Sequence, residues 1–491
     1  MNISAVIGFF GYLIAMVIVG VYSNKRNEEA RATTGSSWLS QYVVGDRDLS
    51  WLAIGMAMVT TIYSAGTFIG APGLAYADGY VWPFSVGFQN LAGALPLAIV
   101  GIRYAILGRK LNFVSYLDFY KVRYNNKAVT VLAGIALIGL LIPLMTAQFA
   151  AGARVVEVFT GVPYKVGIAI MVLVVGFYTV VGGYRAVVVS DIVQGIVMTI
   201  GAILLWFALL RSNGLTGIHT ALLESKPGHL TMNNIPLAIR GIWVFAIWVI
   251  GAPQTVWKCT TYKTSKDMYT AVILSAIIVT IFSTTFQLWG VFGAALLPNL
   301  EAADKVIPTM ILEYLPGFLA GILIVSPVAA LMSTVDSALL ISSATVVKDL
   351  YNLSGKKKTL SLKQTKWFTY GFSTVVILFV LWTSIEPPKF LELFVMYALG
   401  GIGAVFFWPF LLGLYWKGAT PTGCLASMLL SLPFYVLNDR YWKLFGLRSS
   451  ITTWVVSALI MIIVSLITPK TPIENIKKCW EPYTTKTASA D

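Results

Sequence analysis

The chain has 491 residues, of which 57% are hydrophobic and only 11% are charged, and its mean hydropathy is +0.78. An ordinary soluble domain has about 25% charged residues, so this composition excludes a soluble globular enzyme. The net charge of +14 does not indicate nucleic-acid binding, because the basic residues are divided among short loops instead of forming one patch. We therefore predict an all-α polytopic protein of the cytoplasmic membrane, with the lipid bilayer as its surroundings.

Apolar segments that are long enough to cross a hydrocarbon core of about 30 Å recur along the chain. Hydropathy, with glycine, proline and charge as boundaries, predicts about thirteen spans. In chain order they cover residues 3–22, 50–77, 83–107, 127–158, 163–182, 188–210, 237–258, 268–297, 315–346, 367–384, 391–415, 421–438 and 449–468. Segment 110–124 mixes basic and aromatic residues and is expected to lie on the membrane surface.

The distribution of Lys and Arg predicts the orientation, because cytoplasmic loops retain these residues. Most of the 35 fall in alternate loops, such as 23–49 and 347–366. This pattern predicts an outside N-terminus and a cytoplasmic C-terminus, with 469–491 as a short cytoplasmic tail. Lys258, at the end of the seventh span, is interpreted as one of the cytoplasmic loop charges.

The sequence contains few residues that suit metal or covalent chemistry. Its three cysteines fall in or near predicted cytoplasmic segments, where thiols stay reduced. His219 and His229 share one polar loop that has no ligand cluster at metal spacing, so we expect no zinc site and no organic cofactor. The sequence has no HExxH or GxSxG motif and no ring-forming filter segment, so we expect neither an enzyme nor a channel.

Two of the predicted spans are interrupted by small residues and proline. The second contains SAGTFIGAPG at 64–73 and the seventh contains IGAPQT at 250–255. They open two stretches of five spans each, 50–210 and 237–415, and because five is odd the second stretch must cross the membrane in the opposite sense. This pattern is typical of an inverted-repeat transporter. The alternative is that glycine and proline only kink packed helices.

Five stretches of the sequence resemble the sodium/solute symporter family, and the TxxGG motif at 179–183 is diagnostic of it. Within that family the chain is most similar to the members that carry pantothenate. The resemblance implies a LeuT-type fold of two inverted five-helix repeats, with one extra span at 3–22 and two at 421–468. The five stretches are TIYSAGTFIGAPG at 61–73, TAQFAAGAR at 146–154, TVVGGYRAVVVSDIVQG at 179–195, AALMSTVDSALL at 329–340 and SSATVVKDLY at 342–351.

The resemblance also implies one sodium ion between the second and ninth spans. By position its ligands are the carbonyls of Thr60, Tyr63 and Ala330 and the hydroxyls of Ser333 and Thr334. The spacing agrees independently, because the last three residues share one helix face, and hard cations prefer such neutral oxygens. The alternative for the two hydroxyls is a hydrogen bond to the preceding turn of their own helix. Na+ is thus the expected coupling ion.

Two acidic residues within the spans are further candidates. Asp191 matches a family acid linked to the exit path of sodium, or it is a charge beside the N-terminal dipole of the sixth span. Asp336 departs from the members that carry pantothenate, which have a neutral side chain at this position. It is interpreted as a coupling acid for a cation or a proton, or as a structural hydrogen-bond partner of a neighbouring helix.

The resemblance places the solute between the interrupted spans and the fourth span. Arg154 would suit a carboxylate of the solute, but Glu157 at i+3 offers it an ion pair instead. We predict a sodium-coupled secondary active symporter that imports pantothenate or a similar small organic acid. Another solute such as proline, a monocarboxylate or a sugar, coupling to protons, and a transporter-like sensor are the alternatives. The candidate solute-binding residues are Ser64, Gly66, Thr67, Gln148, Arg154 and Gln254.

Overall fold

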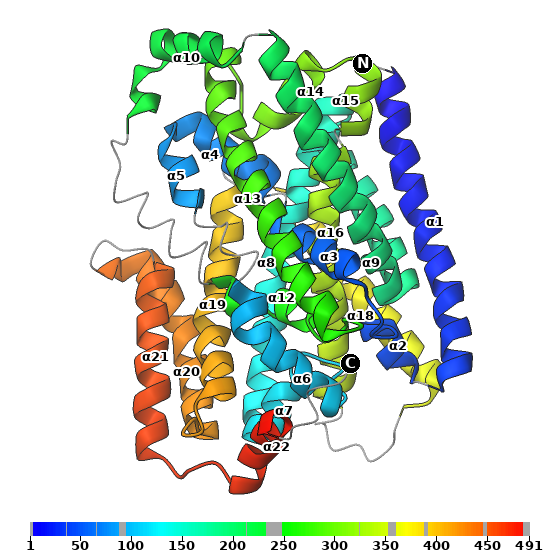
Figure 1. Cartoon of the computed structure of the whole chain (residues 1–491), viewed down its shortest axis with the longest axis vertical. Helices are drawn as coiled ribbons and strands as arrows, with labels where there is room; N and C mark the ends of the chain where they lie inside the picture. The colour runs from blue at the N-terminus through cyan, green and yellow to red at the C-terminus, as the bar shows by residue number, and fades with distance from the viewer. Residues whose placement is uncertain are drawn as a thin grey trace.

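The structure is a computed structural model that describes residues 3–35, 37–64, 66–87, 95–212, 214–231, 248–323, 325–351, 360–386, 391–444 and 449–484. These residues form a bundle of helices, most of which run along the long axis of the molecule (Figure 1). Outside the helices, the described ranges contain one isolated β-bridge, between Leu49 and Tyr262, and no strand. The all-α prediction is therefore confirmed.

The helices differ widely in length. The long ones are α1 (Ile3–Thr34), α8 (Lys127–Thr160), α9 (Tyr164–Ser212), α13 (Ser265–Leu296), α16 (Val325–Ala344), α18 (Leu362–Thr383), α19 (Leu391–Tyr415), α20 (Pro421–Leu437) and α21 (Ser449–Ile467). The shorter ones are α2 (Trp38–Val44), α3 (Trp51–Ile62), α4 (Ala71–Asp78), α5 (Val81–Gly87), α6 (Ile102–Lys110), α7 (Asp118–Tyr124), α10 (Gly214–Ser225), α12 (Pro253–Lys258), α14 (Val306–Tyr314), α15 (Gly317–Leu323) and α22 (Ile473–Thr484). Single turns also occur, among them η1 (Gly66–Gly70), η3 (Pro96–Gly101), η5 (Trp248–Gly251) and η7 (Thr345–Leu350).

Many of these helices suit a lipid bilayer. Within the described residues, eight helices are long and apolar enough to cross a membrane, and a ninth candidate is the bent pair Trp51–Ile62 and Gly66–Asp78. Other predicted spans are divided or short. The third is divided among α5, η3 and α6, with residues 88–94 outside the described part, and α20 has 17 residues. The multi-pass character is confirmed.

One predicted loop is shorter than expected. The fifth and sixth predicted spans are two helical segments of α9 that meet at Gly183, whose non-helical backbone (φ 59°, ψ −155°) stands where a loop at 183–187 was expected. A Cβ atom at Gly183 would lie 2.6 Å from the ring of Tyr42, so glycine is required by both its backbone conformation and the lack of space. The second helical segment therefore begins directly after the TxxGG motif and carries Asp191 into the core.

Both predicted interruptions occur in the structure. After α3, Tyr63 has an extended conformation (φ −85°, ψ 110°), and the chain resumes as the π-helical turn η1 at an angle of 57°. In the seventh predicted span, Ala252 is extended (φ −67°, ψ 117°) between η5 and α12, which begins with Pro253. The rest of that span, 237–247, lies outside the described residues. In a bilayer, such breaks are tolerated where they are buried in protein or line a cavity.

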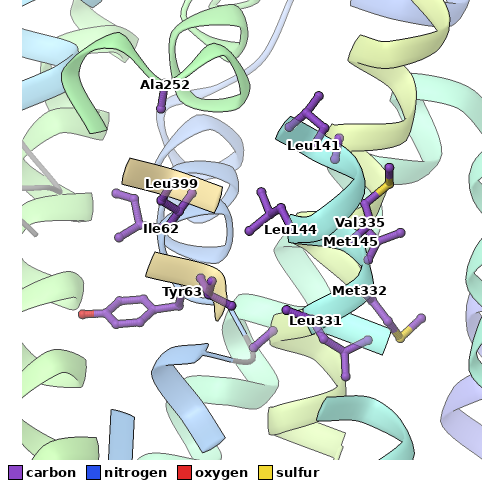
Figure 2. Packing of buried hydrophobic residues seen from close by; sticks show 14 of the residues in the cluster. Ile62, Tyr63, Leu141, Leu144, Met145, Ala252, Leu331, Met332, Val335 and Leu399 are labelled. Carbon is purple, nitrogen blue, oxygen red and sulfur yellow. The ribbon is translucent and has the colours of Figure 1, made fainter. Parts of the chain in front are cut away.

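The core lies around α16, whose side chains are all buried. Its Leu331 and Val335 lie close to the inner face of α8, which presents Leu141 and Leu144 (Figure 2). Residues 141, 144, 145 and 148 repeat at i, i+3, i+4 and i+7, so Gln148 belongs to the same inward face. The helix α8 thus directs one amide side chain into an otherwise apolar layer.

The predicted surface segment 110–124 forms α7 at the end of the bundle that also carries α2 and α22 (Figure 1). Asp118 accepts hydrogen bonds from the backbone N–H of Ser115 at 3.0 Å and from the ammonium of Lys348 in η7. Burial on its own would raise the pKa of Asp118, but Lys348 and the Ser115 N–H together hold it below the usual value. Asp118 is therefore charged at neutral pH and ties α7 to η7, which directly follows α16.

Candidate functional site

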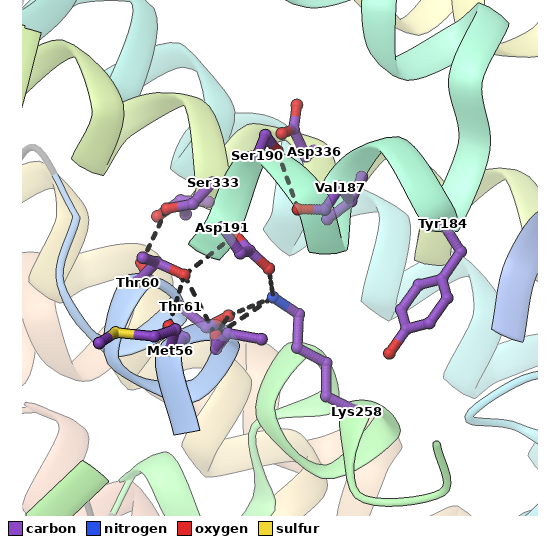
Figure 3. A network of polar contacts seen from close by, with 12 residues as sticks. Met56, Thr60, Thr61, Tyr184, Val187, Ser190, Asp191, Lys258, Ser333 and Asp336 are labelled. Atoms are coloured by element: carbon purple, nitrogen blue, oxygen red, sulfur yellow. Dashed lines mark hydrogen bonds and ion pairs between the residues drawn. The ribbon is translucent and has the colours of Figure 1, made fainter. Parts of the chain in front are cut away.

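The predicted sodium ligands of α3 and α16 converge in the core. Ser333 Oγ lies 2.8 Å from the carbonyl oxygen of Thr60 and 3.0 Å from that of Ala330 (Figure 3). Thr334 Oγ1 lies 3.4 Å from the same Ala330 oxygen. All four residues are buried. The structure therefore gathers neutral carbonyl and hydroxyl oxygens from two helices at one point, which is the donor set that a hard monovalent cation prefers.

Tyr63 is the remaining residue of the predicted set, and its expected ligand is the backbone carbonyl. Because Tyr63 is extended at the end of α3, its carbonyl leaves the hydrogen-bond ladder of the helix. Its ring points away from Leu331 and Met332 of α16 (Figure 2), and its hydroxyl donates to the carbonyl of Val279 in α13. The side chain of Tyr63 thus serves the packing of α3 against α13, and sodium binding by its carbonyl stays a prediction.

The alternative for the hydroxyls, bonding to the preceding turn, is present in part. Ser333 and Thr334 both reach the carbonyl of Ala330, which lies one turn earlier in α16. The contact from Ser333 to Thr60 is different, because it joins two helices that are 273 residues apart in the sequence. Local hydrogen bonding therefore does not account for the position of Ser333.

Asp191 belongs to the same cluster. Its Oδ1 accepts a hydrogen bond from Thr60 Oγ1 at 2.9 Å, and its Oδ2 lies 2.7 Å from the Nζ of Lys258 (Figure 3). Asp191 is fully buried, within α9 and eight residues after the kink at Gly183. Its neighbours are thus a predicted sodium-ligand residue and a basic residue, and it lies eight residues into its helical segment, away from the N-terminal end of that segment.

Lys258 was missed as a functional residue, and its assignment to the cytoplasmic loop charges is wrong. Its side chain is 1% exposed, and Nζ donates to Asp191, to Thr61 Oγ1 at 2.6 Å and to the carbonyl of Ala57 at 3.3 Å. The reason is that α12 packs in the core beside α3 and ends at Lys258, so the loop begins only afterwards. One signal was available: an aspartate inside a span requires a partner, and Lys258 is one of the two basic residues of the second interrupted span, 237–258.

Asp336 forms a separate contact between α16 and α9. Its two carboxylate oxygens accept hydrogen bonds from the hydroxyls of Tyr178 and Thr179, and the side chain is fully buried. Thr179 is the first residue of the TxxGG motif. This geometry is that of the structural hydrogen-bond alternative, since both oxygens are used to hold a neighbouring helix.

Five of the predicted solute-binding residues are buried beside the interrupted helices. Ser64 Oγ accepts a hydrogen bond from the backbone N–H of Gly66 at 3.2 Å, and Gly66 and Thr67 lie in η1. Gln148 is on the inner face of α8, which contacts η1. Gln254 of α12 is 2% exposed, and its Oε1 has no hydrogen-bond partner among the described residues. A buried amide oxygen without a partner costs about 1–3 kcal/mol, so the site favours a ligand that donates a hydrogen bond there.

Arg154 lies apart from this group. Its Nη1 is 3.3 Å from Glu157 Oε2, its guanidinium lies 5.3 Å from the ring centroid of Tyr164, and its side chain is 25% exposed. The arginine thus makes the i, i+3 ion pair that the sequence offered as the alternative to solute binding. A partly exposed pair of this kind adds less than about 1 kcal/mol of stability.

Comparisons with known proteins show the family to which the chain belongs. The sequence model of the Sodium:solute symporter family matches residues 42–431. The sodium/pantothenate symporter of Haemophilus influenzae is 32% identical over 436 residues, which are 86% of this chain and 89% of that protein. The sodium/pantothenate symporter of Escherichia coli is 32% identical over 452 residues, covering 90% and 92% of the two chains.

A solved structure gives the same fold. A substrate-bound, outward-open Na+-coupled sialic acid symporter superimposes with a TM-score of 0.76 and 22% sequence identity, covering 96% of this chain and 99% of that one. The fold is thus that of the LeuT-like sodium symporters. The chain belongs to the sodium:solute symporter family and is a multi-pass, sodium-coupled symporter of the cell membrane.

Proposed function

We propose that this symporter imports pantothenate or a similar small organic acid together with sodium. The proposal of the solute rests on the two pantothenate symporters that are 32% identical to the chain over most of its length. Polar groups of the interrupted helices agree with a small solute of this kind. In particular, Oε1 of Gln254, which has no hydrogen-bond partner in the part of the chain that the structure describes, suits the hydroxyl or amide donors of such a molecule.

The observation that carries the mechanism is the 2.8 Å contact between Ser333 of α16 and the Thr60 carbonyl of α3. A sodium ion held by Thr60, Tyr63, Ala330, Ser333 and Thr334 would join these helices at the break, and a solute bound at the same break would favour the same closed state. Two ligands that favour one state strengthen each other's binding, which is the physical basis of coupling. One net charge moved through 100 mV supplies about 2.3 kcal/mol.

The architecture that we propose has thirteen spans, an outside N-terminus and a cytoplasmic C-terminus. Residues 50–210 and 237–415 form the inverted repeats, each of which starts with an interrupted helix. In this orientation the end of the bundle that carries α2, α7 and α22 faces the cytoplasm. Alternating access is then a movement of the two interrupted helices against α8 and α16.

The first expected result concerns transport itself. In proteoliposomes, an inward sodium gradient should accumulate labelled pantothenate, because sodium entry supplies the free energy. An equal potassium gradient, or a proton gradient without sodium, should not do so. Uptake is measured by filtration, with protein-free liposomes as the control. No pantothenate uptake under a sodium gradient would reject this solute, and a panel with proline, monocarboxylates and sugars would then identify the class that is carried.

Asp336 tests the choice between sodium and proton coupling. Since both of its oxygens accept hydrogen bonds from α9, Asp336→Asn should lower the apparent melting temperature, but it should leave the sodium dependence of uptake unchanged. Thr179→Val is the matched control, because it removes one of the two hydrogen bonds and keeps the carboxylate. Loss of coupling in Asp336→Asn alone, with flux no longer dependent on an ion gradient, would instead assign Asp336 as the coupling acid.

A further inference from the structure

The ammonium of Lys258 joins the second interrupted helix to α9 through its ion pair with Asp191, and to the first interrupted helix through further hydrogen bonds. Lys258 is the last residue of α12, which also carries Gln254, and Asp191 lies on α9. The ammonium also reaches Thr61 and Ala57 of α3. Figure 3 shows Lys258 extending from its own helix toward Asp191 and Thr61. A single side chain of the second interrupted helix is therefore fixed against the first.

The pair is also in direct contact with the proposed sodium site. Oδ2 of Asp191 lies against Lys258, while its Oδ1 accepts from Thr60 Oγ1 at 2.9 Å, and the carbonyl of Thr60 faces Ser333 Oγ at 2.8 Å. Three consecutive contacts thus connect Lys258 to Ser333. All four residues are nearly inaccessible to solvent, with exposed fractions of 1% or less, so water screens these charges little.

The charges of this cluster disfavour the presence of two cations, the ammonium of Lys258 and a sodium ion, beside Asp191 at the same time. The proposed sodium ligands are neutral, so the charged groups among these residues are the carboxylate of Asp191 and the ammonium of Lys258. A sodium ion beside Thr60 is attracted by Asp191 and repelled by Lys258. While the ammonium stays on Asp191, the two fixed charges compensate each other, and the carboxylate contributes little to sodium binding.

We propose that Lys258 is a tethered cation that competes with sodium for Asp191, and that it thereby couples the position of α12 to the release of sodium. When α12 moves away, the carboxylate is freed and strengthens the binding of sodium. When α12 returns, the ammonium takes the carboxylate and the ion leaves. Lys258 is thus a positioning residue that acts through Asp191, and its role rests on the sodium site of the proposed function.

The test measures sodium binding directly, without solute and without transport. Purified protein is titrated with radioactive sodium in a scintillation proximity assay. Lys258→Gln keeps a hydrogen-bond donor but removes the charge, so it should lower the Kd for sodium by about tenfold, as expected for the loss of one nearby buried charge. Lys258→Arg keeps the charge and should bind sodium as the unaltered protein does.

A neutral pair separates competition from a structural role. Lys258→Met combined with Asp191→Asn removes both charges. The decrease in the sodium Kd that is expected for Lys258→Gln should therefore be absent in this double variant. If Lys258 only supports the fold, Lys258→Gln will bind sodium equally or more weakly, and this overturns the proposal. If Lys258→Gln does not fold, the sodium Kd values of the neutral pair and of Lys258→Arg are used to decide between competition and a structural role. A neutral pair that binds sodium more than tenfold more tightly than the unaltered protein contradicts competition for Asp191.

A second readout follows the movement of α12. Cys259, the next residue, is fully buried. In a background with Cys424→Ser and Cys479→Ser, Lys258→Gln should increase the rate at which a small maleimide alkylates Cys259, because α12 is no longer held against α3. Failure of the proposed sodium site would look different, since then even the unaltered protein would bind no sodium or would be insensitive to changes at Ser333 and Thr334.

Discussion

Replacing Ser333 and Thr334 by alanine is expected to raise the sodium concentration for half-maximal uptake by about tenfold each, and by roughly a hundredfold together. Each hydroxyl that binds a charged group is worth about 1.5–3 kcal/mol, and a carbonyl site that loses two of its ligands cannot replace them from the apolar surroundings. The measurement is initial uptake against sodium concentration in proteoliposomes. Direct sodium binding should weaken in parallel, while the yield of folded protein stays nearly the same.

Ser326→Ala is the matched control for these variants. Ser326 lies on the same helix, is 2% exposed and places its hydroxyl 3.2 Å from the carbonyl of Val197. The Ser326→Ala variant therefore loses a helix-to-helix hydrogen bond of the same kind, but two helical turns away from the proposed ion. Unchanged sodium dependence in the double alanine variant would remove the site assignment, and an equal effect in Ser326→Ala would attribute the change to general loosening of α16.

Arg123→Met is expected to destabilise the protein strongly, with a loss of roughly 3–5 kcal/mol in the free energy of unfolding. Arg123 is fully buried in α7, and its guanidinium donates to the carbonyls of Gly413 at 2.9 Å, Trp416 at 3.1 Å and Ala419 at 3.0 Å. These carbonyls belong to the end of α19 and the turn after it, where a helix has no internal donors left. Methionine would remove these three hydrogen bonds, although the carbonyls of Trp416 and Ala419 would keep those from the N–H of Ala419 and the hydroxyl of Thr471.

The measurement for Arg123 is the apparent melting temperature in detergent, followed by size-exclusion chromatography after heating. Arg123→Lys should be intermediate, because a point charge cannot reach three carbonyls with the fixed geometry of a guanidinium. Arg26→Met is the control: Arg26 lies at the surface, 3.5 Å from Glu29, and its loss should change stability by less than about 0.5 kcal/mol. A melting temperature that does not change in Arg123→Met would contradict a capping role.

Some of the site could be predicted because local patterns specify it. Ala330, Ser333 and Thr334 share a helix face at a fixed spacing, and this spacing, with the family motifs around it, led to the contact with Thr60 that the structure contains. Asp191 was recognised in the same way. Local patterns did not specify the partners of the acids, since Asp191 meets Lys258 across 67 residues and Asp336 meets Tyr178 across 158.

The sequence by itself determined the class of this protein and the places where its helices break. Composition and hydropathy act through the bilayer on each segment separately, and the glycine and proline residues near Ser64 and Ala252 act on the local backbone, so neither depends on the rest of the fold. Only the tertiary structure decided which charges are buried. Lys258 lies at the end of a predicted span, yet it is in the core because α12 packs beside α3. Charges at membrane depth are stable only when paired, and the pairing is made by the packing of helices that are distant in the chain.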